Sequence, residues 1–454
     1  MNKAKLKCIL TDDKYPTSRV MYRCDDCGDL LDVVYDFHGV DPDKLKKTWR
    51  NRRKWNRPID VSGVWRYREL IPFYDYEGQI VTYPEGNTPL LQAPISAKYA
   101  GLSRLQMKHQ GYNPTGSFKD NGMTTGVTQA NILGMKAVAC ASTGNTSSSM
   151  SAYAARAGML GIVLIPDNQV AFGKLCQTLD YGALTLQVMG DFDVAQKLVL
   201  EVAAEMGIYV LNSVNPFRLE GQKTVMIELL EQRGWRVPDR VVVPGGNLGN
   251  SSSYGKALRE LYDLGFIDRM PKITIIQAQG ADPLYKTMIS PHPDKLITVH
   301  AKTLATAIKI GQPVSWKKAK RAMEWTDGWV TEVSEQEIAD AKAIIGRDGI
   351  GCEPAAATTV AGIKRLVATG TDREVSRDED VVAILTGHML KDADYTLRYH
   401  LDELYEDYVT EVHVTHRHGK VNSTFANRPI RIEPDREKVV RVIEERMRSL
   451  LADR

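Results

Sequence analysis

A lysine in a turn-rich loop is the residue of this chain best suited to covalent chemistry. Two turn-forming pairs precede it, Asn113-Pro114 and Thr115-Gly116, and Phe118 next to it can anchor the loop in a core. The pattern predicts that Lys119 stands where a helix begins. Burial and the field of a helix N-terminus both disfavour an ammonium ion, and only the neutral amine is a nucleophile. Lys119 therefore suits a Schiff base, although a lysine in a loop is more often a solvated surface charge.

Two further loops each join a buried strand to a helix, and each suits an anion. The first, 141–149, is rich in hydroxyl groups, and the second, 244–251, is rich in glycine. Backbone N–H groups at a helix N-terminus hold carboxylates and phosphates, and glycine lets them approach without obstruction from a Cβ atom. The second loop is neither a Walker loop nor a GxGxxG fingerprint. Either loop alone fits an ordinary tight turn equally well.

Length and composition indicate a soluble, multi-lobed enzyme. The 454 residues allow two or three cores. A net charge of +3 is too small to argue for a nucleic-acid or membrane partner. No apolar run approaches a membrane span, and no signal-peptide core follows the first residues. Because the chain has only six cysteines, free thiols in the cytoplasm are expected.

Alternating strands and helices must position these loops from about residue 81 onward. Apolar runs predict buried strands at 161–166, 185–188 and 273–277, with helices such as 193–206 between them. This alternation predicts an α/β architecture with largely parallel sheets. The charged tail after about residue 400 is expected to end in a helix over 434–451, which a proline opens.

Taken together, the loops resemble those of the fold-type II pyridoxal phosphate (PLP) enzymes, the superfamily of the tryptophan synthase β subunit. The matching stretches are the opening motif 85–90, the lysine motif 113–120, the substrate-carboxylate loop 142–146 and the phosphate cradle 245–250. Within the superfamily, stretches 212–224 and 385–392 and the N-terminal cysteine segment resemble the threonine synthase family. The resemblance covers about residues 20 to 395, and several loops in the expected order make it far more specific than any one of them.

The resemblance implies two open, largely parallel twisted sheets with flanking helices, plus a small N-terminal cysteine unit and a C-terminal helical tail. The expected divisions are a degenerate zinc-ribbon-like unit (1–40), a helical extension (41–80), a large PLP-binding domain (81–135 and 226–400), a small substrate-closing domain (136–225) and the tail (401–454). Residues 41–80 are basic and aromatic. They could touch an anionic partner, but they fit better a helix that lies on the catalytic body with a solvated face.

The resemblance also implies PLP as the cofactor and gives residues roles around it. Lys119 is the expected catalytic residue and attachment point, and Phe118 is expected near the ring. Asn145 would orient the 3-hydroxyl group, and Thr386 occupies the position of a neutral partner for the ring nitrogen. The expected phosphate cradle consists of Gly245, Gly246, Asn247, Leu248, Gly249 and Asn250.

The implied substrate is O-phospho-L-homoserine, which carries an amine, a carboxylate and a phosphate. The expected binding residues are Ser142, Thr143 and Thr146 at the carboxylate, and Asn212, Ser213, Arg218 and Lys223 at the leaving phosphate. Arg218 is the main candidate at the leaving phosphate because a planar guanidinium group offers phosphate two parallel hydrogen bonds. A structural ion pair with Glu220 or another acid is the alternative for Arg218.

The implied reaction is a β,γ-replacement in which O-phospho-L-homoserine and water give L-threonine and phosphate. Lys119, once it is a neutral base, would take the Cα proton. Two alternatives stay open: a cysteate-synthase-like replacement on O-phosphoserine, and a non-catalytic PLP-fold protein. The expected enzyme is cytoplasmic and acts on a small phosphorylated amino acid, and a homodimer is left open.

The N-terminal cysteines have the spacing of an incomplete zinc ribbon. Cys24 and Cys27 form a CxxC knuckle with Cys8 upstream, but Thr11 stands where the partner of Cys8 would be expected. A closed structural zinc site needs four ligands, and the fourth would have to come from Asp12, Asp13, a histidine or water. The sequence alone therefore favours little or no zinc, and the catalytic chemistry calls for no metal.

Overall fold

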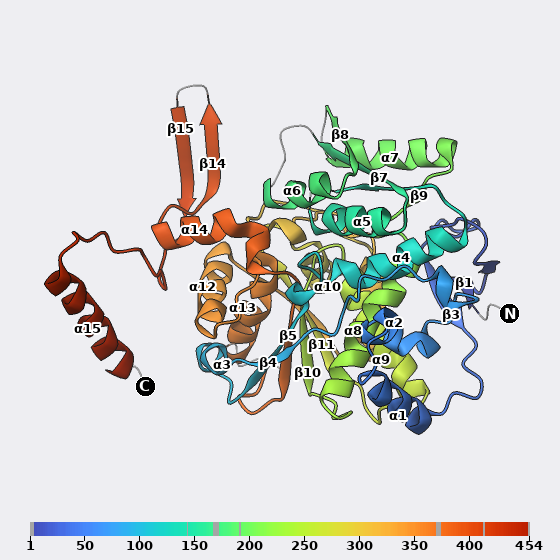
Figure 1. The fold of residues 1–454 in the computed structure, drawn as a ribbon, viewed down its shortest axis with the longest axis horizontal. Coiled ribbons are helices and arrows are strands. Elements are labelled where there is room, and N and C mark those ends of the chain that lie inside the picture. The colour runs from blue at the N-terminus through green and yellow to red at the C-terminus, as the bar shows by residue number, and fades with distance from the viewer. Residues whose placement is uncertain are drawn as a thin grey trace.

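Two sheets flanked by helices form the body of the molecule (Figure 1). The computed structural model describes residues 4–142, 144–166, 172–189, 192–368, 374–411 and 414–452. The larger sheet consists of β12 (Trp329–Val333), β11 (Lys272–Ala278), β10 (Arg240–Pro244), β13 (Val381–Leu385), β5 (Leu105–His109) and β4 (Leu90–Gln92), in that order. The smaller consists of β8 (Leu184–Val188), β7 (Leu160–Pro166), β6 (Ala137–Ala141) and β9 (Tyr209–Val210). Neighbouring strands run parallel except β4 and β5, which confirms the predicted fold class.

The two central strands of the larger sheet, β10 and β13, are largely apolar because helices cover both faces of the sheet. Every residue of β10 and of β13 is buried, as parallel sheets require. Val242 of β10 packs with α3 (Pro94–Ala100), α12 (Glu335–Arg347) and α13 (Pro354–Ala368). Its neighbours Val241 and Val243 face α8 (Pro216–Gln232), α9 (Gly249–Asp263) and α11 (Trp316–Trp325).

The smaller sheet is covered in the same way. Val138 and Cys140 of β6 pack with α4 (Lys119–Ile132) and α5 (Asn145–Arg156), while Ala139 and Ala141 face α7 (Phe192–Met206). The strands predicted at 161–166, 185–188 and 273–277 are β7, β8 and β11, and the helix predicted at 193–206 is α7. The two sheets draw on different parts of the chain, but the exact domain boundaries stay predictions.

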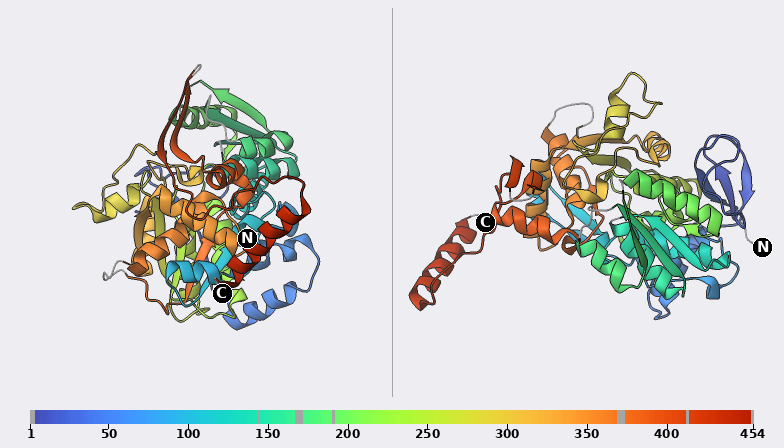
Figure 2. Two further views of the ribbon diagram at one scale, coloured as in Figure 1. Left: turned by 90° about the vertical axis from the view of Figure 1, so that its left-hand side faces the viewer. Right: turned by 90° about the horizontal axis from the view of Figure 1, so that it is seen from above.

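A small antiparallel sheet of β1 (Ala4–Cys8), β2 (Lys14–Pro16) and β3 (Leu31–Tyr35) stands at one end of the molecule (Figure 2). Lys318 of α11 pairs with Asp32 at 2.8 Å and donates to Leu31 O at 2.7 Å. The helix that follows, α1 (Pro42–Arg52), lies on the body as expected, because its buried Trp49 stacks on Phe266 at 5.3 Å.

The C-terminal tail leaves the body. After α14 (Ala393–Leu401), the hairpin of β14 (Tyr405–Glu411) and β15 (Val414–Lys420) projects outward, and α15 (Arg436–Ala452) lies apart at the end opposite β1 (Figures 1 and 2). The helix predicted at 434–451 is thus confirmed as α15. Among the described helices, none has the length and apolar character that crossing a membrane requires.

Candidate active site

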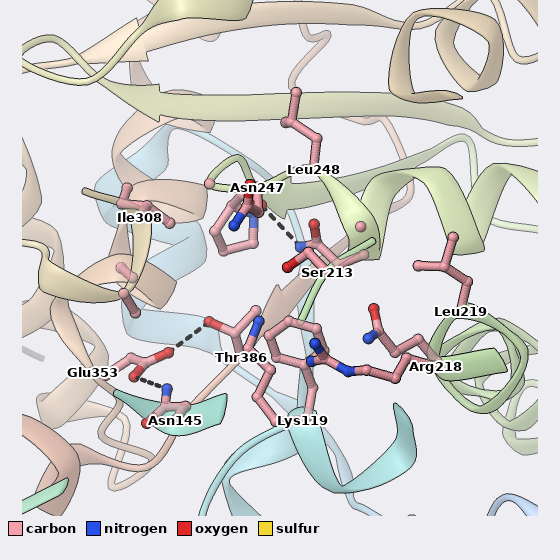
Figure 3. Close-up of a pocket in the computed structure, with 18 residues that line it drawn as sticks. Lys119, Asn145, Ser213, Arg218, Leu219, Asn247, Leu248, Ile308, Glu353 and Thr386 are labelled. Carbon is pink, nitrogen blue, oxygen red and sulfur yellow. Dashed lines mark hydrogen bonds between the residues drawn. The ribbon is translucent and has the colours of Figure 1, made fainter. Parts of the chain in front are cut away.

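A pocket lies where helix N-termini meet the carboxyl ends of β10 and β13 (Figure 3). Such crevices are where open α/β sheets bind ligands. The empty space among its lining residues, including the part that is open to solvent, measures about 550 Å³. Eleven of the residues predicted from the sequence line it: Phe118, Lys119, Asn145, Ser213, Arg218, Gly246, Asn247, Leu248, Gly249, Asn250 and Thr386.

Lys119 is the first residue of α4, as predicted. The loop before it is fixed because buried Asp120 accepts hydrogen bonds from Thr115 N at 2.7 Å and Ser149 Oγ at 2.5 Å. Phe118 N also donates to Thr386 O at 3.0 Å. Burial and, to a smaller extent, the nearby positive charge of Arg218 lower the pKa of Lys119 to about 7. The amine is therefore substantially neutral near pH 7, as a nucleophile must be.

The glycine-rich turn after β10 brings free N–H groups to one wall. Leu248 adopts a left-handed conformation (φ 64°) as the N-cap of α9, and the first N–H groups of a helix have no acceptor within it. A Cβ atom at Gly246 would lie 3.1 Å from Ile308 Cα, so glycine lets this wall close. The prediction that Gly245 belongs to the phosphate cradle is wrong. Gly245 does not line the pocket, and its N–H group donates to Ile276 O at 2.7 Å.

A buried carboxylate that the sequence reading missed links two of the predicted residues. Glu353 is 1% exposed, and it accepts hydrogen bonds from Thr386 Oγ1 at 2.9 Å and Asn145 Nδ2 at 2.8 Å (Figure 3). It directly precedes α13, whose first residue is Pro354. The sequence did contain a signal for Glu353: it is a single acidic residue among small apolar residues, directly before a proline that opens a helix.

Arg218 points into the pocket from α8 without a carboxylate partner among the residues that the structure describes (Figure 3). It is 1% exposed and donates to Leu211 O at 2.8 Å, and its Nε has no partner within that part of the chain. The alternative ion pair with Glu220 is not formed, because Glu220 pairs with Lys223 and Lys256. Burial lowers the pKa of Arg218 to about 10, so the group stays cationic at neutral pH. A buried, unpaired guanidinium group is a site for an anion.

The remaining predicted residues that the structure describes do not line the pocket. The prediction for Lys223 is wrong, because its ammonium group pairs with Glu220 at 2.8 Å and with Glu260 at 2.7 Å. Asn212 uses its amide on the backbone of Ala141, at 3.1 and 3.0 Å, and so fixes the end of β6. Ser142 and Thr146 are half-buried beside the pocket, with Ser142 Oγ accepting from Gly144 N. Thr143 falls outside the described residues.

The donor set fits PLP. An amine with a lowered pKa, a helix N-terminus for a phosphate and a hydroxyl group for a ring nitrogen face one cavity. Buried Asn145 Oδ1 and Gln222 Oε1 also line it and have no partner among the described residues. Buried polar atoms of this kind indicate a polar ligand.

Comparisons with known proteins agree with this chemistry. The family model described as "Pyridoxal-phosphate dependent enzyme" matches residues 81–387. The chain is 45% identical over 393 residues to a threonine synthase of Methanocaldococcus jannaschii, covering 86% of this chain and 94% of the relative. It is 36% identical to the chloroplastic threonine synthase 2 of Arabidopsis thaliana, covering 96% and 83%. The crystal structure of threonine synthase from Escherichia coli superposes with a TM-score of 0.64 at 16% identity, covering 85% and 89%.

Proposed function

This chain belongs to the pyridoxal-phosphate-dependent enzymes and, among them, to the threonine synthases, and from that premise we propose that it converts O-phospho-L-homoserine and water into L-threonine and phosphate. One observation carries the proposal from the structural side. A buried amine, Lys119, and a buried guanidinium group without a carboxylate partner in the described chain, Arg218, line one cavity. The reaction needs both: a group that attaches the cofactor and moves a proton, and a cation for the leaving phosphate.

When bound, PLP supplies an electron sink for the negative charge that develops on the substrate carbon. Lys119 would hold it, Phe118 would lie against its ring, and the first N–H groups of α9 would bind its phosphate. The Lys119 amine would remove the Cα proton of the bound substrate and later return it. Its lowered pKa suits this work, because a base must be unprotonated to act.

The Glu353 carboxylate decides what Thr386 can offer to the ring nitrogen. The Thr386 hydroxyl group donates its proton to Glu353 Oε1 at 2.9 Å. Toward the ring nitrogen, the Thr386 oxygen can then only accept a hydrogen bond. Thr386 would therefore favour a protonated ring nitrogen, which strengthens the electron sink, whereas the sequence alone implied a neutral partner that leaves this open.

Replacing Glu353 with glutamine is expected to lower kcat about tenfold, the cost of roughly one strong hydrogen bond, with little effect on KM. The glutamine oxygen would keep the hydrogen bond from Asn145 Nδ2, while its amide N–H group would donate to Thr386 Oγ1 and so turn the Thr386 proton toward the ring. We also expect a changed visible spectrum of the bound cofactor and a shifted pH profile, measured on the same variant.

The matched control is Asp348→Asn. Asp348 also accepts hydrogen bonds, from Ile95 N and Ser96 N, both at 2.9 Å, and from Ser96 Oγ at 2.5 Å, but it lies outside the pocket. This change is expected to lower thermal stability and to leave the cofactor spectrum alone. Equal spectra for wild type and Glu353→Gln would contradict the role given to Glu353.

The substrate phosphate would lie between Arg218 and Ser213, which both line the pocket. The substrate carboxylate would meet the hydroxyl-rich turn around Ser142 and Thr146, which stands beside the pocket at the start of α5. Closure of the small domain would bring that turn to the substrate, as the domain division proposes. The cytoplasmic location and the homodimer also stay predictions.

A product assay tests the proposed function. The chain with PLP is incubated with O-phospho-L-homoserine, and separately with O-phospho-L-serine and sulfite, while phosphate and amino acids are quantified. Threonine and phosphate in equal amounts from the first substrate are expected. Turnover of phosphoserine alone would identify a cysteate-synthase-like enzyme, and no turnover of either would identify a non-catalytic protein.

The pH dependence of cofactor attachment gives an independent check. Only neutral Lys119 attacks the aldehyde, and its pKa is about 7. The rate at which PLP attaches to cofactor-free protein should thus rise as pH increases toward 7 and level off above it. A solvated lysine, with a pKa of about 10.4, would give a rate that still rises at pH 9. The growth of visible absorbance after mixing measures this rate.

A further inference from the structure

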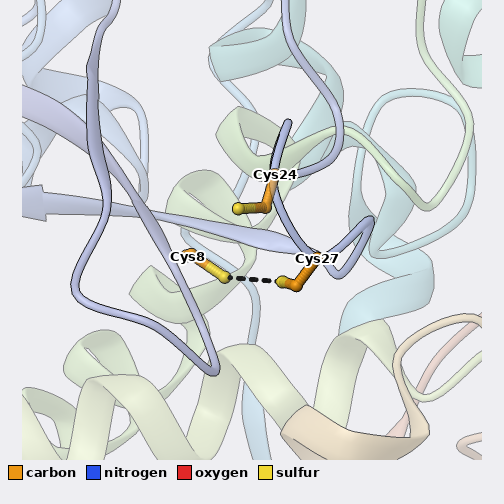
Figure 4. Close-up of side chains that lie close together, drawn as sticks. All are labelled: Cys8, Cys24 and Cys27. Carbon is orange, nitrogen blue, oxygen red and sulfur yellow. Dashed lines mark hydrogen bonds between the residues drawn. The ribbon is translucent and has the colours of Figure 1, made fainter.

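The three N-terminal cysteines, which the proposed reaction does not use, converge on one point (Figure 4). Their sulfur atoms all lie within 4.8 Å of one another, and Cys8 Sγ is 3.4 Å from Cys27 Sγ. Cys8 ends β1, whereas Cys24 and Cys27 lie on the turn before β3. Two separate turns therefore face each other and direct their sulfur atoms inward.

A carboxylate lies beside one of the three sulfur atoms. Asp13 Oδ2 is 3.6 Å from Cys24 Sγ. With zinc–sulfur bonds of about 2.3 Å and a zinc–oxygen bond of about 2.1 Å, a tetrahedral site separates a sulfur from an oxygen by about 3.6 Å and two sulfurs by about 3.8 Å. The Cys24–Asp13 separation matches such an edge, and the Cys8–Cys27 separation of 3.4 Å is a little shorter than one. A movement of the Asp13 carboxylate toward Cys8 and Cys27 would complete the tetrahedron.

The surroundings of these groups are also those of a metal site. The N–H groups of Leu10 and Thr11 point at Cys8 Sγ from 3.4 and 3.5 Å, and the Tyr15 hydroxyl lies 3.2 Å from Cys24 Sγ. The Thr11 hydroxyl donates to Asp13 Oδ2. Hydrogen bonds of this kind orient ligands and hold negative charge on them. Thr11, which stands where the fourth cysteine would be expected, thus holds the Asp13 carboxylate beside Cys24.

We propose that Cys8, Asp13, Cys24 and Cys27 bind one zinc ion. Three thiolates and one carboxylate in a tetrahedron are a donor set that zinc accepts. A Cys8–Cys27 disulfide is the competing arrangement, but it would leave Cys24 and Asp13 facing each other without a shared cation. The sequence alone favoured little or no zinc because it did not show that Asp13 reaches the cysteines.

The ion would join the two turns of the N-terminal unit rather than take part in catalysis. The small sheet is tied to the body by separate contacts, such as Lys318 with Asp32 at 2.8 Å and Lys256 Nζ with Val33 O at 2.7 Å. Since these contacts do not depend on a metal, loss of zinc should loosen residues 8–27 while the body stays folded. Threonine formation should survive a chelator.

Metal analysis of the full chain, purified under reducing conditions from zinc-supplemented medium, tests the proposal. About one zinc ion per chain is expected, released together with increased proteolysis near residues 8–27 when a strong chelator is added. Cobalt added to the metal-free chain should give the absorption of tetrahedral thiolate coordination. Less than about one tenth of a zinc ion per chain with no cobalt spectrum, or a Cys8–Cys27 disulfide, would overturn the proposal.

Variants of neighbouring residues identify the fourth ligand. Asp13→Asn is expected to weaken zinc binding by about 100-fold or more, and Thr11→Cys to strengthen it. Asp12→Asn is the matched control, because this adjacent carboxylate is exposed and pairs with Lys7 at 2.8 Å. Zinc affinity in Asp13→Asn equal to that in Asp12→Asn would remove Asp13 from the site. Circular dichroism of each variant shows whether the chain is folded.

Discussion

Replacing Lys119 with alanine is expected to lower the formation of threonine from O-phospho-L-homoserine by about 10⁴-fold or more. Lys119 is both the group that attaches PLP and the base that moves the Cα proton, so its loss removes two functions at once. The visible absorbance of the lysine-linked cofactor should disappear with the activity. The fold should persist, because Lys119 Nζ contacts the Phe118 ring at 4.3 Å and has no ion-pair partner among the described residues.

Lys309→Ala is the matched control for this result. Lys309 is exposed and directly follows the pocket residue Ile308, so its replacement removes a nearby lysine without touching the proposed chemistry. Activity close to wild type is expected in that variant. Steady-state turnover retained by Lys119→Ala, measured as phosphate release and as threonine, would remove the whole assignment.

Much of this site could be predicted because its chemistry resides in local sequence. A lysine after paired turns, and a glycine-rich turn after a buried strand, each define a short segment whose backbone is fixed by its own residues. Lys119 and Gly246 to Asn250 were found in this way. The strand that ends at Pro244 and the helix that begins at Gly249 then determine which way the turn faces.

The residues that the sequence reading misplaced depend on contacts between distant parts of the chain. Glu353 lies 33 residues from Thr386 and 208 from Asn145, and its motif alone could equally open a structural helix. Lys223 was assigned to the phosphate because it lies in the stretch 212–224, which resembles the threonine synthase family. On a helix the side chains of Arg218 and Lys223 do not share a face, and Glu260 of α9 takes the Lys223 charge.

The N-terminal unit illustrates the same limit. The spacing of Cys8, Cys24 and Cys27 suggested an incomplete ribbon, and several residues were equal candidates for a fourth ligand. Only the pairing of β1 with β2, which sets Lys7 opposite Lys14, turns the chain so that Asp13 rather than Asp12 approaches the sulfur atoms. Register between strands is not readable from such short segments.

Replacing Arg218 with lysine is expected to reduce kcat/KM for O-phospho-L-homoserine by about 10- to 150-fold, or about 1.5–3 kcal/mol. The positive charge is kept, but an ammonium group cannot donate to Leu211 O, as Arg218 does at 2.8 Å, and also offer a fork to a phosphate. PLP binding should change little, because the cofactor phosphate is assigned to the N-terminus of α9.

Arg233→Lys separates this effect from the general cost of losing a buried arginine. Arg233 is also buried and donates to Gln106 and Asp380, but it does not line the pocket. That variant should lose thermal stability and keep kcat/KM. Arg218→Lys should show the reverse, with a loss that is large for the phosphorylated substrate and small for a phosphate-free amino acid bound as an inhibitor. Because the leaving phosphate is the one part that the two ligands do not share, equal losses for both would mean that Arg218 does not touch it.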